Sequence, residues 1–411
     1  MTDRFTATVP VPGPAATAIS RRFPLAALLA LAMTSFIAIL AETLPAGLLP
    51  QISQGLGISE VMTGQLVTVF AIGSILTAIP LTAMTSGWRR RKVLLLAVGG
   101  FLVFNTVTAL APNYMVALAS RFLAGMAAGL AWGLMAGYAR RMVSVAQQGR
   151  AMAVAMIGTP LALSLGVPLG TLMGGVLGWR SIFGVMSGLA IILVAWILVA
   201  VPDYPGQKQG ERLSIGQVFV TPGVRPILAV IVAWMLAHNI LYTYIAPFLA
   251  PSGLRARIDL VLLVYGVGSL AGIWLISRLI DRWLRKLVLG CIAAFALVAI
   301  ALGLAMDSPA VIYISMAVWG VTFGGAGTLL QTASADAAGE GMDVAQSMVA
   351  TIWNLAIAGG GLAGGVLLDG YGVAAFPWTM LGLLLAALGV AWSARSSFKP
   401  GRRTGGVVAG H

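Results

Sequence analysis

Charged side chains are scarce in this sequence, and their scarcity excludes a soluble globular protein. Asp, Glu, Lys and Arg together make up 9% of the 411 residues, whereas 59% of the residues are hydrophobic. A soluble domain carries about 25% charged residues. The chain is therefore expected in a lipid bilayer, where an apolar surface is stable.

Cysteine and histidine are also rare, and this excludes most redox and metal chemistry. Cys291 is the only cysteine, so no intramolecular disulfide can form, and there are only two histidines. The HExxH, CxxC, GK[ST] and GxSxG patterns are missing as well. Gly359, Gly361 and Gly364 match GxGxxG, but they lie in an apolar stretch with no strand before it, which excludes nucleotide binding. We expect no metal, no cofactor and no enzymatic activity.

Long apolar runs, by contrast, fill the chain. A membrane-spanning helix takes about 20 predominantly apolar residues. Twelve stretches meet this length, at roughly 24–48, 60–83, 92–111, 114–138, 150–176, 181–201, 226–249, 258–280, 287–306, 309–332, 345–368 and 373–394. They predict an all-α integral membrane protein with twelve transmembrane helices.

Basic residues outnumber acidic ones, and their placement indicates the topology. The 25 Lys and Arg and the 12 Asp and Glu give a net charge of +13. All the basic residues except Arg121, Arg180, Arg255 and Arg257 fall in the two tails or in alternate loops between the predicted spans. The positive-inside rule makes these segments cytoplasmic, which predicts a bacterial inner-membrane protein with both termini in the cytoplasm. The positive charge therefore does not indicate nucleic-acid binding.

The two halves of the sequence resemble each other at a constant offset of 195 residues (264 − 69). Val69, Gly73 and Ser74 fall on Val264, Gly268 and Ser269, and the same register later pairs Gly125 with Gly320. Two like halves of a membrane protein are typical of transporters. We expect two pseudo-repeated six-helix bundles, at 24–201 and 226–394. A cytoplasmic tail at 1–23, a cytoplasmic linker at 202–225 and a cytoplasmic tail at 395–411 complete the predicted organisation.

Four stretches of the sequence resemble the major facilitator superfamily. They are ETLPAGLLPQIS at 42–53, TAMTSGWRRRKVLL at 82–95, RFLAGMAAG at 121–129 and GVPLGTLMGGVLGWRSIF at 166–183. The sequence is most similar to the twelve-span drug:proton antiporters of the arabinose-efflux-permease-like and chloramphenicol-resistance-like branch. This resemblance implies two bundles of six helices and proton-coupled efflux.

Two of these stretches carry the gating residues that the resemblance implies. The signature loop has Ser86 where the family has an acidic residue and Arg89 where it has a glycine, and Arg90 and Arg91 follow. The second-half copy of this loop, at 277–286, keeps Asp281 and Arg282, and the acid of this loop helps to latch the bundles in the family. In span five, Gly166, Pro168 and Gly170 form the antiporter motif. Pro168 removes a backbone hydrogen bond and can bend the helix.

Glu42 is the carboxylate that the sequence places well inside a span, and Arg121 lies at a similar depth in span four. A charge in hydrocarbon is costly unless it faces a cavity, has a partner or is neutralised. Glu42 is therefore a candidate proton site, and an Arg121 salt bridge would modulate it. The alternatives are that Glu42 only touches water at the outer interface, or that the pair has a purely structural role.

His238 lies near the middle of span seven, with Asn239 next to it and Tyr242 one turn later. A histidine there can relay a proton or bind substrate, although it can equally well be satisfied by a backbone carbonyl between helices. Asn354 in span eleven and, more weakly, Asn105 in span three are further candidates for the cavity lining.

These observations predict a secondary transporter that exports a small amphipathic organic compound, drug-like or sugar-like, as protons enter. Its partners would be that compound, protons and the bilayer, and it would act as a monomer. A proton-linked importer or a facilitator of sugars or nucleosides is the alternative within transport. A non-transporting membrane sensor or scaffold is the alternative from another class, but the predicted loops are short for an output surface.

Overall fold

The computed structural model describes residues 23–398 apart from 79, 86, 145–146, 207–214, 340–341 and 396. These described residues are helical without strands, and twelve of their helices are long and apolar enough to cross a membrane. The predicted all-α class and the twelve spans are therefore confirmed. Most of the predicted tails at 1–23 and 395–411, and the centre of the predicted linker, lie outside the described residues.

The first bundle contains six spans, several of which are built from more than one helix. Its elements are α1 (Leu25–Gly47), α2 (Leu49–Leu56), α3 (Glu60–Ala78), α4 (Pro80–Met84), α5 (Arg90–Leu110), α6 (Tyr114–Arg141), α7 (Gln148–Met156), α8 (Gly158–Leu161), the π-helix η2 (Ala162–Gly166), α9 (Val167–Leu177) and α10 (Trp179–Ala200). Span five is the most broken of them. Pro168 has no N–H to donate to the Ser164 carbonyl, and the π-helical turn η2 lies where that bond is missing.

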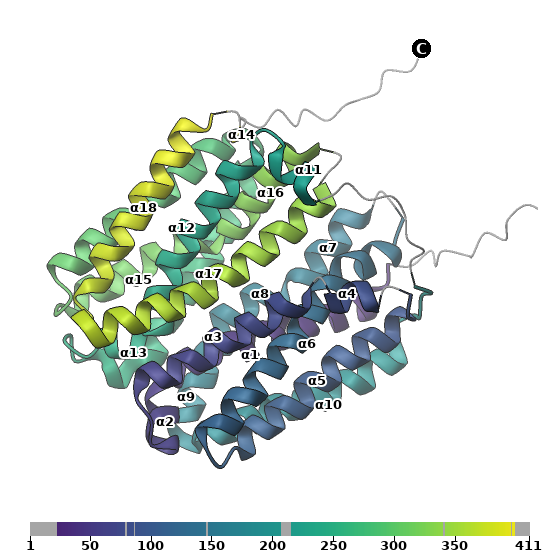
Figure 1. The fold of residues 1–411 in the computed structure, drawn as a ribbon, viewed down its shortest axis with the longest axis horizontal. Helices are drawn as coiled ribbons and strands as arrows, with labels where there is room; N and C mark the ends of the chain where they lie inside the picture. The colour runs from purple at the N-terminus through teal and green to yellow at the C-terminus, as the bar shows by residue number, and fades with distance from the viewer. Residues whose placement is uncertain are drawn as a thin grey trace, which may run out of the picture.

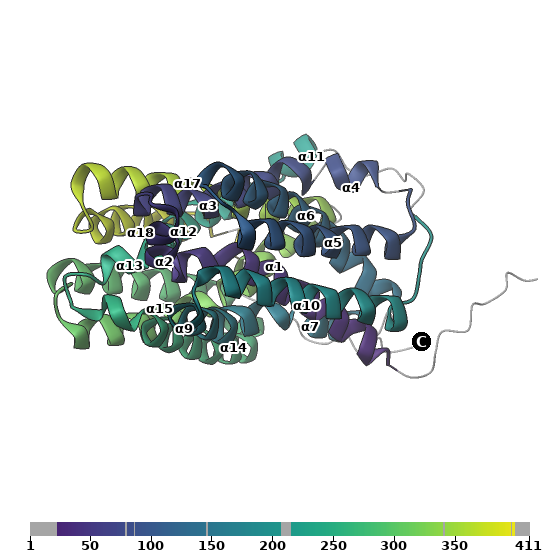
Figure 2. The same cartoon turned by 90° about the horizontal axis from the view of Figure 1, so that it is seen from below.

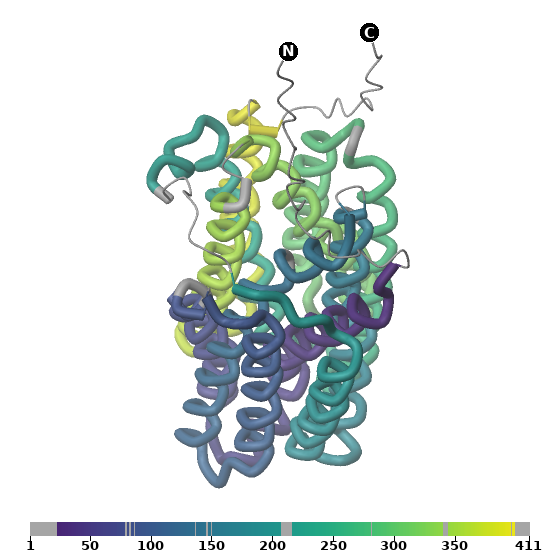
Figure 3. The backbone as a smooth tube through the Cα atoms, turned by 90° about the vertical axis from the view of Figure 1, so that its right-hand side faces the viewer, coloured from purple at the N-terminus to yellow at the C-terminus, as the bar shows by residue number. Residues whose placement is uncertain are grey.

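The second bundle repeats this plan with one long, interrupted helix. Its elements are α12 (Val224–Thr243), α13 (Ile245–Phe248), η3 (Leu254–Arg257), α14 (Ile258–Leu304), α15 (Pro309–Gly324), α16 (Ala326–Ala338), α17 (Met342–Tyr371) and α18 (Ala375–Ser393), and α11 (Ile215–Val220) precedes them in the predicted linker. α14 contains spans eight and nine, and its backbone leaves the helical region at Trp283 (φ −132°, ψ 26°). The short helix α11 packs against α12 and α17 of this bundle (Figure 3).

Glycines bring the same pair of helices together in each half. A Cβ atom on Gly125 of α6 would overlap the Phe70 carbonyl of α3, and one on Gly73 would overlap the Phe122 carbonyl. The second half repeats this crossing 195 residues later, between the beginning of α14 and α15, with Gly268 and Gly320 in the equivalent places. Small residues allow such close approach of membrane helices. The repeat in the sequence is thus a repeat of helix packing.

The two bundles lie side by side and contact each other mainly toward one end (Figure 1). α2 and α13 lie at this end, here called the distal end, whereas α4, α7 and α11 lie at the opposite, terminal end (Figures 1 and 2). Across the interface α3 packs against α17, α9 and η2 pack against α14, and α1 packs against α12 and α13. α7 and α16, toward the terminal end, pack mainly within their own bundles. The closure between the bundles is therefore distal.

Candidate functional site

A carboxylate and a guanidinium lie buried near each other in the first bundle. Glu42 of α1 is 4% exposed and Arg121 of α6 is 0% exposed, and the two interact electrostatically. Arg121 donates a hydrogen bond to the Ala41 carbonyl. Its guanidinium carbon lies 4.5 Å from the centre of the Phe70 ring and 5.8 Å from that of Phe183. A backbone carbonyl and two aromatic rings thus fix the cation beside Glu42.

Several polar atoms of this pair have no partner. Among the described residues, Glu42 Oε1 and Arg121 Nε and Nη1 are buried and make no hydrogen bond. The direct salt bridge considered from the sequence is therefore not formed between these two side chains. The hydrogen bond that Arg121 makes goes from Nη2 to the backbone of α1. A buried carboxylate without a bonded cation is poorly stabilised in its charged form, and proton uptake would remove that charge.

Five side-chain rings form a buried group in the second bundle, called here the aromatic cluster: His238, Tyr242, Tyr265, Trp319 and Phe323. The His238 ring stacks on Phe323, with centroids 3.6 Å and planes 7° apart, and lies 5.2 Å from the Tyr242 ring. The Tyr265 and Trp319 rings are 4.6 Å apart. Because α12, α14 and α15 all contribute, the cluster exists only when three helices are packed.

The aromatic cluster also contains unused hydrogen-bonding groups. His238 Nδ1, the Tyr242 and Tyr265 hydroxyls and Trp319 Nε1 are buried and have no hydrogen-bond partner among the described residues. Leaving such a group unsatisfied costs about 1–3 kcal/mol. The cluster therefore combines flat apolar surfaces with donors and acceptors that a bound molecule could use.

Tyr242 connects the aromatic cluster to the buried pair. Its hydroxyl approaches the Thr43 hydroxyl of α1 without completing a hydrogen bond, and Thr43 itself donates to the Ile39 carbonyl at 2.7 Å. Thr43 directly follows Glu42, and α1 and α12 are in contact. The candidate proton site and the aromatic cluster are therefore neighbours across the bundle interface.

The three asparagines that the sequence suggested as cavity residues make no hydrogen bond to the buried pair or to the aromatic cluster within the described residues. The Asn239 amide donates to the Met235 carbonyl of its own helix at 2.8 Å, and the Asn354 amide does the same to Ala350 at 3.0 Å. Asn105 is fully buried on α5, and neither of its amide atoms has a partner among the described residues. The structure therefore brings together Glu42, Arg121, His238 and Tyr242, whereas the three asparagines make no hydrogen bond to this group within the described residues.

An ion pair that sequence reasoning missed joins the bundles at the distal end. Arg255 of η3 donates from Nη2 to Glu60 Oε1 at the start of α3. The two residues are 195 positions apart, which is the offset of the internal repeat. A residue and its repeat equivalent can touch only beside the axis that relates the two halves. Opposite charges at equivalent positions were the sequence signal that would have revealed the pair.

A second missed carboxylate holds the signature loop at the terminal end. Arg89 Nε donates to Asp203 Oδ2 at 2.5 Å, and the Arg91 backbone N–H donates to Asp203 Oδ1 at 3.2 Å. Desolvation alone would raise the pKa of Asp203, but these hydrogen bonds and the positive charges outweigh it and lower the pKa. Ser86 and the side chain of Asp281 lie outside the described residues. Asp203 thus supplies a carboxylate to a loop whose own acidic position holds serine.

The remaining motif residues differ in burial, and those of span five pack within the first bundle. Arg90 is 7% exposed, whereas Arg282 is exposed on the second-half copy of the loop. In span five, a Cβ atom on Gly166 or Gly170 would press on side chains of α1, and Pro168 is buried between them. The glycine and proline pattern therefore sets how closely span five approaches α1.

Two pseudo-repeated six-helix bundles, with polar and aromatic groups buried beside their interface, define a membrane transporter. The model of the Major Facilitator Superfamily matches residues 31–361. The chain belongs to that family, and it is a multi-pass transporter rather than an enzyme.

Two curated relatives and one solved structure agree with this assignment. The chain is 29% identical to the uncharacterized MFS-type transporter YbcL of Bacillus subtilis over 362 residues, covering 87% of this chain and 93% of the relative. It is 32% identical to the chloramphenicol efflux pump MT0201 of Mycobacterium tuberculosis over 351 residues, covering 82% and 85%. The same fold is found in a bacterial homolog of the human lysosomal transporter Spinster, which was solved in an inward-facing and unoccupied conformation. The TM-score is 0.66 and the sequence identity 15%, with 92% of this chain and 98% of that chain covered.

Proposed function

We propose that this protein exports a small amphipathic organic compound from the bacterial cytoplasm in exchange for protons. It acts as a monomer in the inner membrane, with both termini cytoplasmic, as the distribution of Lys and Arg predicts. The bundles at 24–201 and 226–394 rock about their interface and are joined by the linker at 202–225. With this topology, the distal closure corresponds to an inward-facing state. The observation that carries the proposal is Glu42, buried without a bonded cation next to the aromatic cluster.

Glu42 is the proton carrier in this proposal. Its position favours the neutral, protonated form while the distal end is closed. When the bundles rock, water reaching Glu42 from one side lets the proton leave or enter. Arg121, held beside it by Ala41 and Phe70, adds a fixed positive charge that eases proton release once water enters.

The aromatic cluster is the substrate-binding wall in this proposal. A flat ring of the substrate packs beside Tyr242, which lies next to α1 at the bundle interface. The unused hydroxyl and ring nitrogen groups of the cluster bind polar atoms of the same molecule. Such a wall suits an uncharged aromatic compound with hydroxyl, amide or nitro groups. The export of chloramphenicol by the pump from Mycobacterium tuberculosis agrees with this substrate class.

Proton entry supplies enough free energy for export. One charge moving down a potential of about 100 mV releases about 2.3 kcal/mol. Because about 1.4 kcal/mol is a factor of ten, one proton per substrate supports a gradient of several tens-fold before any pH difference is counted.

The test uses inverted membrane vesicles that hold a pH gradient. Chloramphenicol, cationic dyes, pentoses and nucleosides are added in turn, and collapse of the gradient is followed with a pH-sensitive probe. We expect one compound class to collapse the gradient with the wild-type protein and the effect to be abolished in Glu42→Gln. Asp307→Asn, which removes the same charge from an exposed loop, is the matched control and should behave as wild type.

The outcomes separate the competing assignments. If Glu42→Gln is inserted normally and transports normally, Glu42 is not the proton site. Loss of transport in His238→Gln, with substrate binding retained, would then assign the proton to His238. Accumulation of radiolabelled substrate in whole cells distinguishes direction, because an exporter lowers it and an importer raises it. Transport that persists without any pH change would indicate a facilitator.

A further inference from the structure

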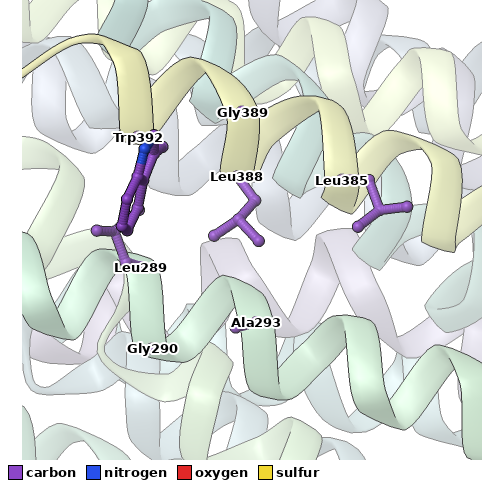
Figure 4. Close-up of a pocket in the computed structure, with 7 residues that line it drawn as sticks. All are labelled: Leu289, Gly290, Ala293, Leu385, Leu388, Gly389 and Trp392. Carbon is purple, nitrogen blue, oxygen red and sulfur yellow. The ribbon is translucent and has the colours of Figure 1, made fainter.

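An apolar groove on the second bundle is lined by none of the residues of the candidate site. It runs between the second part of α14 and α18, has a volume of about 570 Å³ and is open to the outside of the bundle. Its lining includes Leu289, Gly290 and Ala293 of α14 and Leu385, Leu388 and Trp392 of α18 (Figure 4). From Leu385 to Trp392 the groove follows α18 for about 10 Å, roughly a third of the hydrocarbon thickness of a bilayer.

Two glycines leave open space along the groove. Gly290 of α14 and Gly389 of α18 both line the groove, and a Cβ atom on either would meet open space. Leu385 and Trp392, at the two ends on α18, are 53% and 62% exposed. The two glycines therefore leave space along the groove, unlike Gly125, where a Cβ atom would overlap a backbone carbonyl.

One end of the groove is cationic. Arg285 precedes Leu289 by one helical turn, and its Nη2 donates to the Trp392 carbonyl at 2.7 Å, so the guanidinium lies at the mouth of the groove. Lys286 lies over the Trp283 ring at 5.6 Å, and Arg395 is exposed one turn beyond Trp392. Trp at this level is typical of the membrane–water interface. The three cations thus lie at the level of the lipid phosphates, and the groove lies at the level of the acyl chains.

We propose that this groove binds one anionic phospholipid, with an acyl chain against Gly290 and Gly389 and the phosphate held by Arg285, Lys286 and Arg395. Basic pockets between transmembrane helices on the cytoplasmic side recognise anionic head groups in this way. A guanidinium has five N–H donors, and the Trp392 carbonyl takes one of those of Arg285. A two-fold contact with a second copy of the chain would instead bring these three cations against their own copies, which is unfavourable.

The test compares lipid retention by the purified full-length protein in mixed micelles of phosphatidylglycerol and phosphatidylcholine, using native mass spectrometry. We expect the wild type to retain one phosphatidylglycerol preferentially. Arg285→Gln with Lys286→Gln should lower this preference about tenfold or more, because each interfacial cation contributes to binding of anionic lipid. Gly389→Leu, which fills the groove, should lower retention of both lipids.

Arg180→Gln is the matched control. Arg180 also lies beside a tryptophan, Trp179, and also donates to a backbone carbonyl, that of Ala111 at 2.9 Å. It belongs to the other bundle, however, and does not line this groove. It should leave the lipid preference unchanged. The melting temperature of each variant, and the milder Gly389→Ala, show whether a loss comes from unfolding.

Four results would overturn the proposal. Equal loss in Arg180→Gln, or no loss in Arg285→Gln with Lys286→Gln, would show that the groove is not the site. Displacement of the lipid by inorganic phosphate alone would indicate a free-anion site in place of a lipid site. A groove-dependent dimer in the same spectra would assign the groove to a second copy.

Discussion

The distal ion pair between Glu60 and Arg255 predicts the relative populations of the distally open and distally closed states of the transporter. The pair connects the bundles only when the distal end is closed, because each residue belongs to a different bundle. Removing it should therefore leave each bundle intact and favour opening of the distal end. Glu60→Gln and Arg255→Gln are the perturbations, singly and together.

The exposure of the pair determines the expected size of the effect. The side chains are 20% exposed for Glu60 and 46% exposed for Arg255. Partly exposed ion pairs contribute about 0.2–1 kcal/mol. Taking the upper value, because the pair is partly buried, the ratio of distally open to distally closed protein should rise about fivefold. Salt screens such pairs, so high ionic strength should act in the same direction on the wild type.

The single cysteine of the chain makes an accessibility assay possible. Cys291→Ser provides a cysteine-free background, and Thr68→Cys adds a reporter that is 1% exposed and faces Gly361 across the distal interface. A membrane-impermeant maleimide added from the distal face should label the reporter about five times faster in Glu60→Gln. The double neutral variant should match the single ones, because a broken pair cannot be broken twice.

The charge-reversed protein decides the interpretation. Glu60→Arg combined with Arg255→Glu rebuilds the pair and should return the labelling rate to that of the parent. If this double variant labels as fast as the single ones, or if Glu60→Gln labels no faster than the parent, the pair does not stabilise the closed distal end. The inference that the two repeat-equivalent residues hold the bundles together at the distal end would then be wrong.

Three further predictions concern packing, pH and the aromatic cluster. Gly125→Ala places a Cβ atom against the Phe70 carbonyl, and we expect a loss of about 1–3 kcal/mol in stability, seen as a lower melting temperature in detergent. The interaction with Arg89 lowers the pKa of Asp203 in the folded protein. The pair therefore stabilises the fold fully above the ordinary aspartate pKa near about 4, and this stabilisation is lost as the pH falls through the lowered pKa. The melting temperatures of the wild type and Asp203→Asn should differ at about pH 6 and converge in acid. His238→Phe keeps the ring stack but removes Nδ1, and should weaken substrate binding severalfold in a direct binding assay without lowering the melting temperature.

Much of the architecture could be predicted from the sequence because the bilayer allows few solutions. Each span must be about 20 apolar residues long and must satisfy its own backbone as a helix, so counting apolar runs predicted the twelve spans. The repeat at 195 residues predicted the like bundles, since the glycines that carry it, such as Gly125 and Gly320, are the ones at which helices touch. Depth along a helix follows from rise per residue, which is why Glu42 and Arg121 were expected near each other.

The partners of the polar groups were decided only by the tertiary structure. Arg121 bonds to the Ala41 carbonyl in place of Glu42, and Asp203 reaches Arg89 from 114 positions away. The ring of His238 stacks on Phe323, which belongs to another helix, α15. A periodic apolar sequence determines that a helix forms and crosses the membrane, but the rotation of each helix about its axis depends on side-chain packing with neighbours far along the chain. That rotation determines which polar groups meet, and therefore where a proton and a substrate could bind.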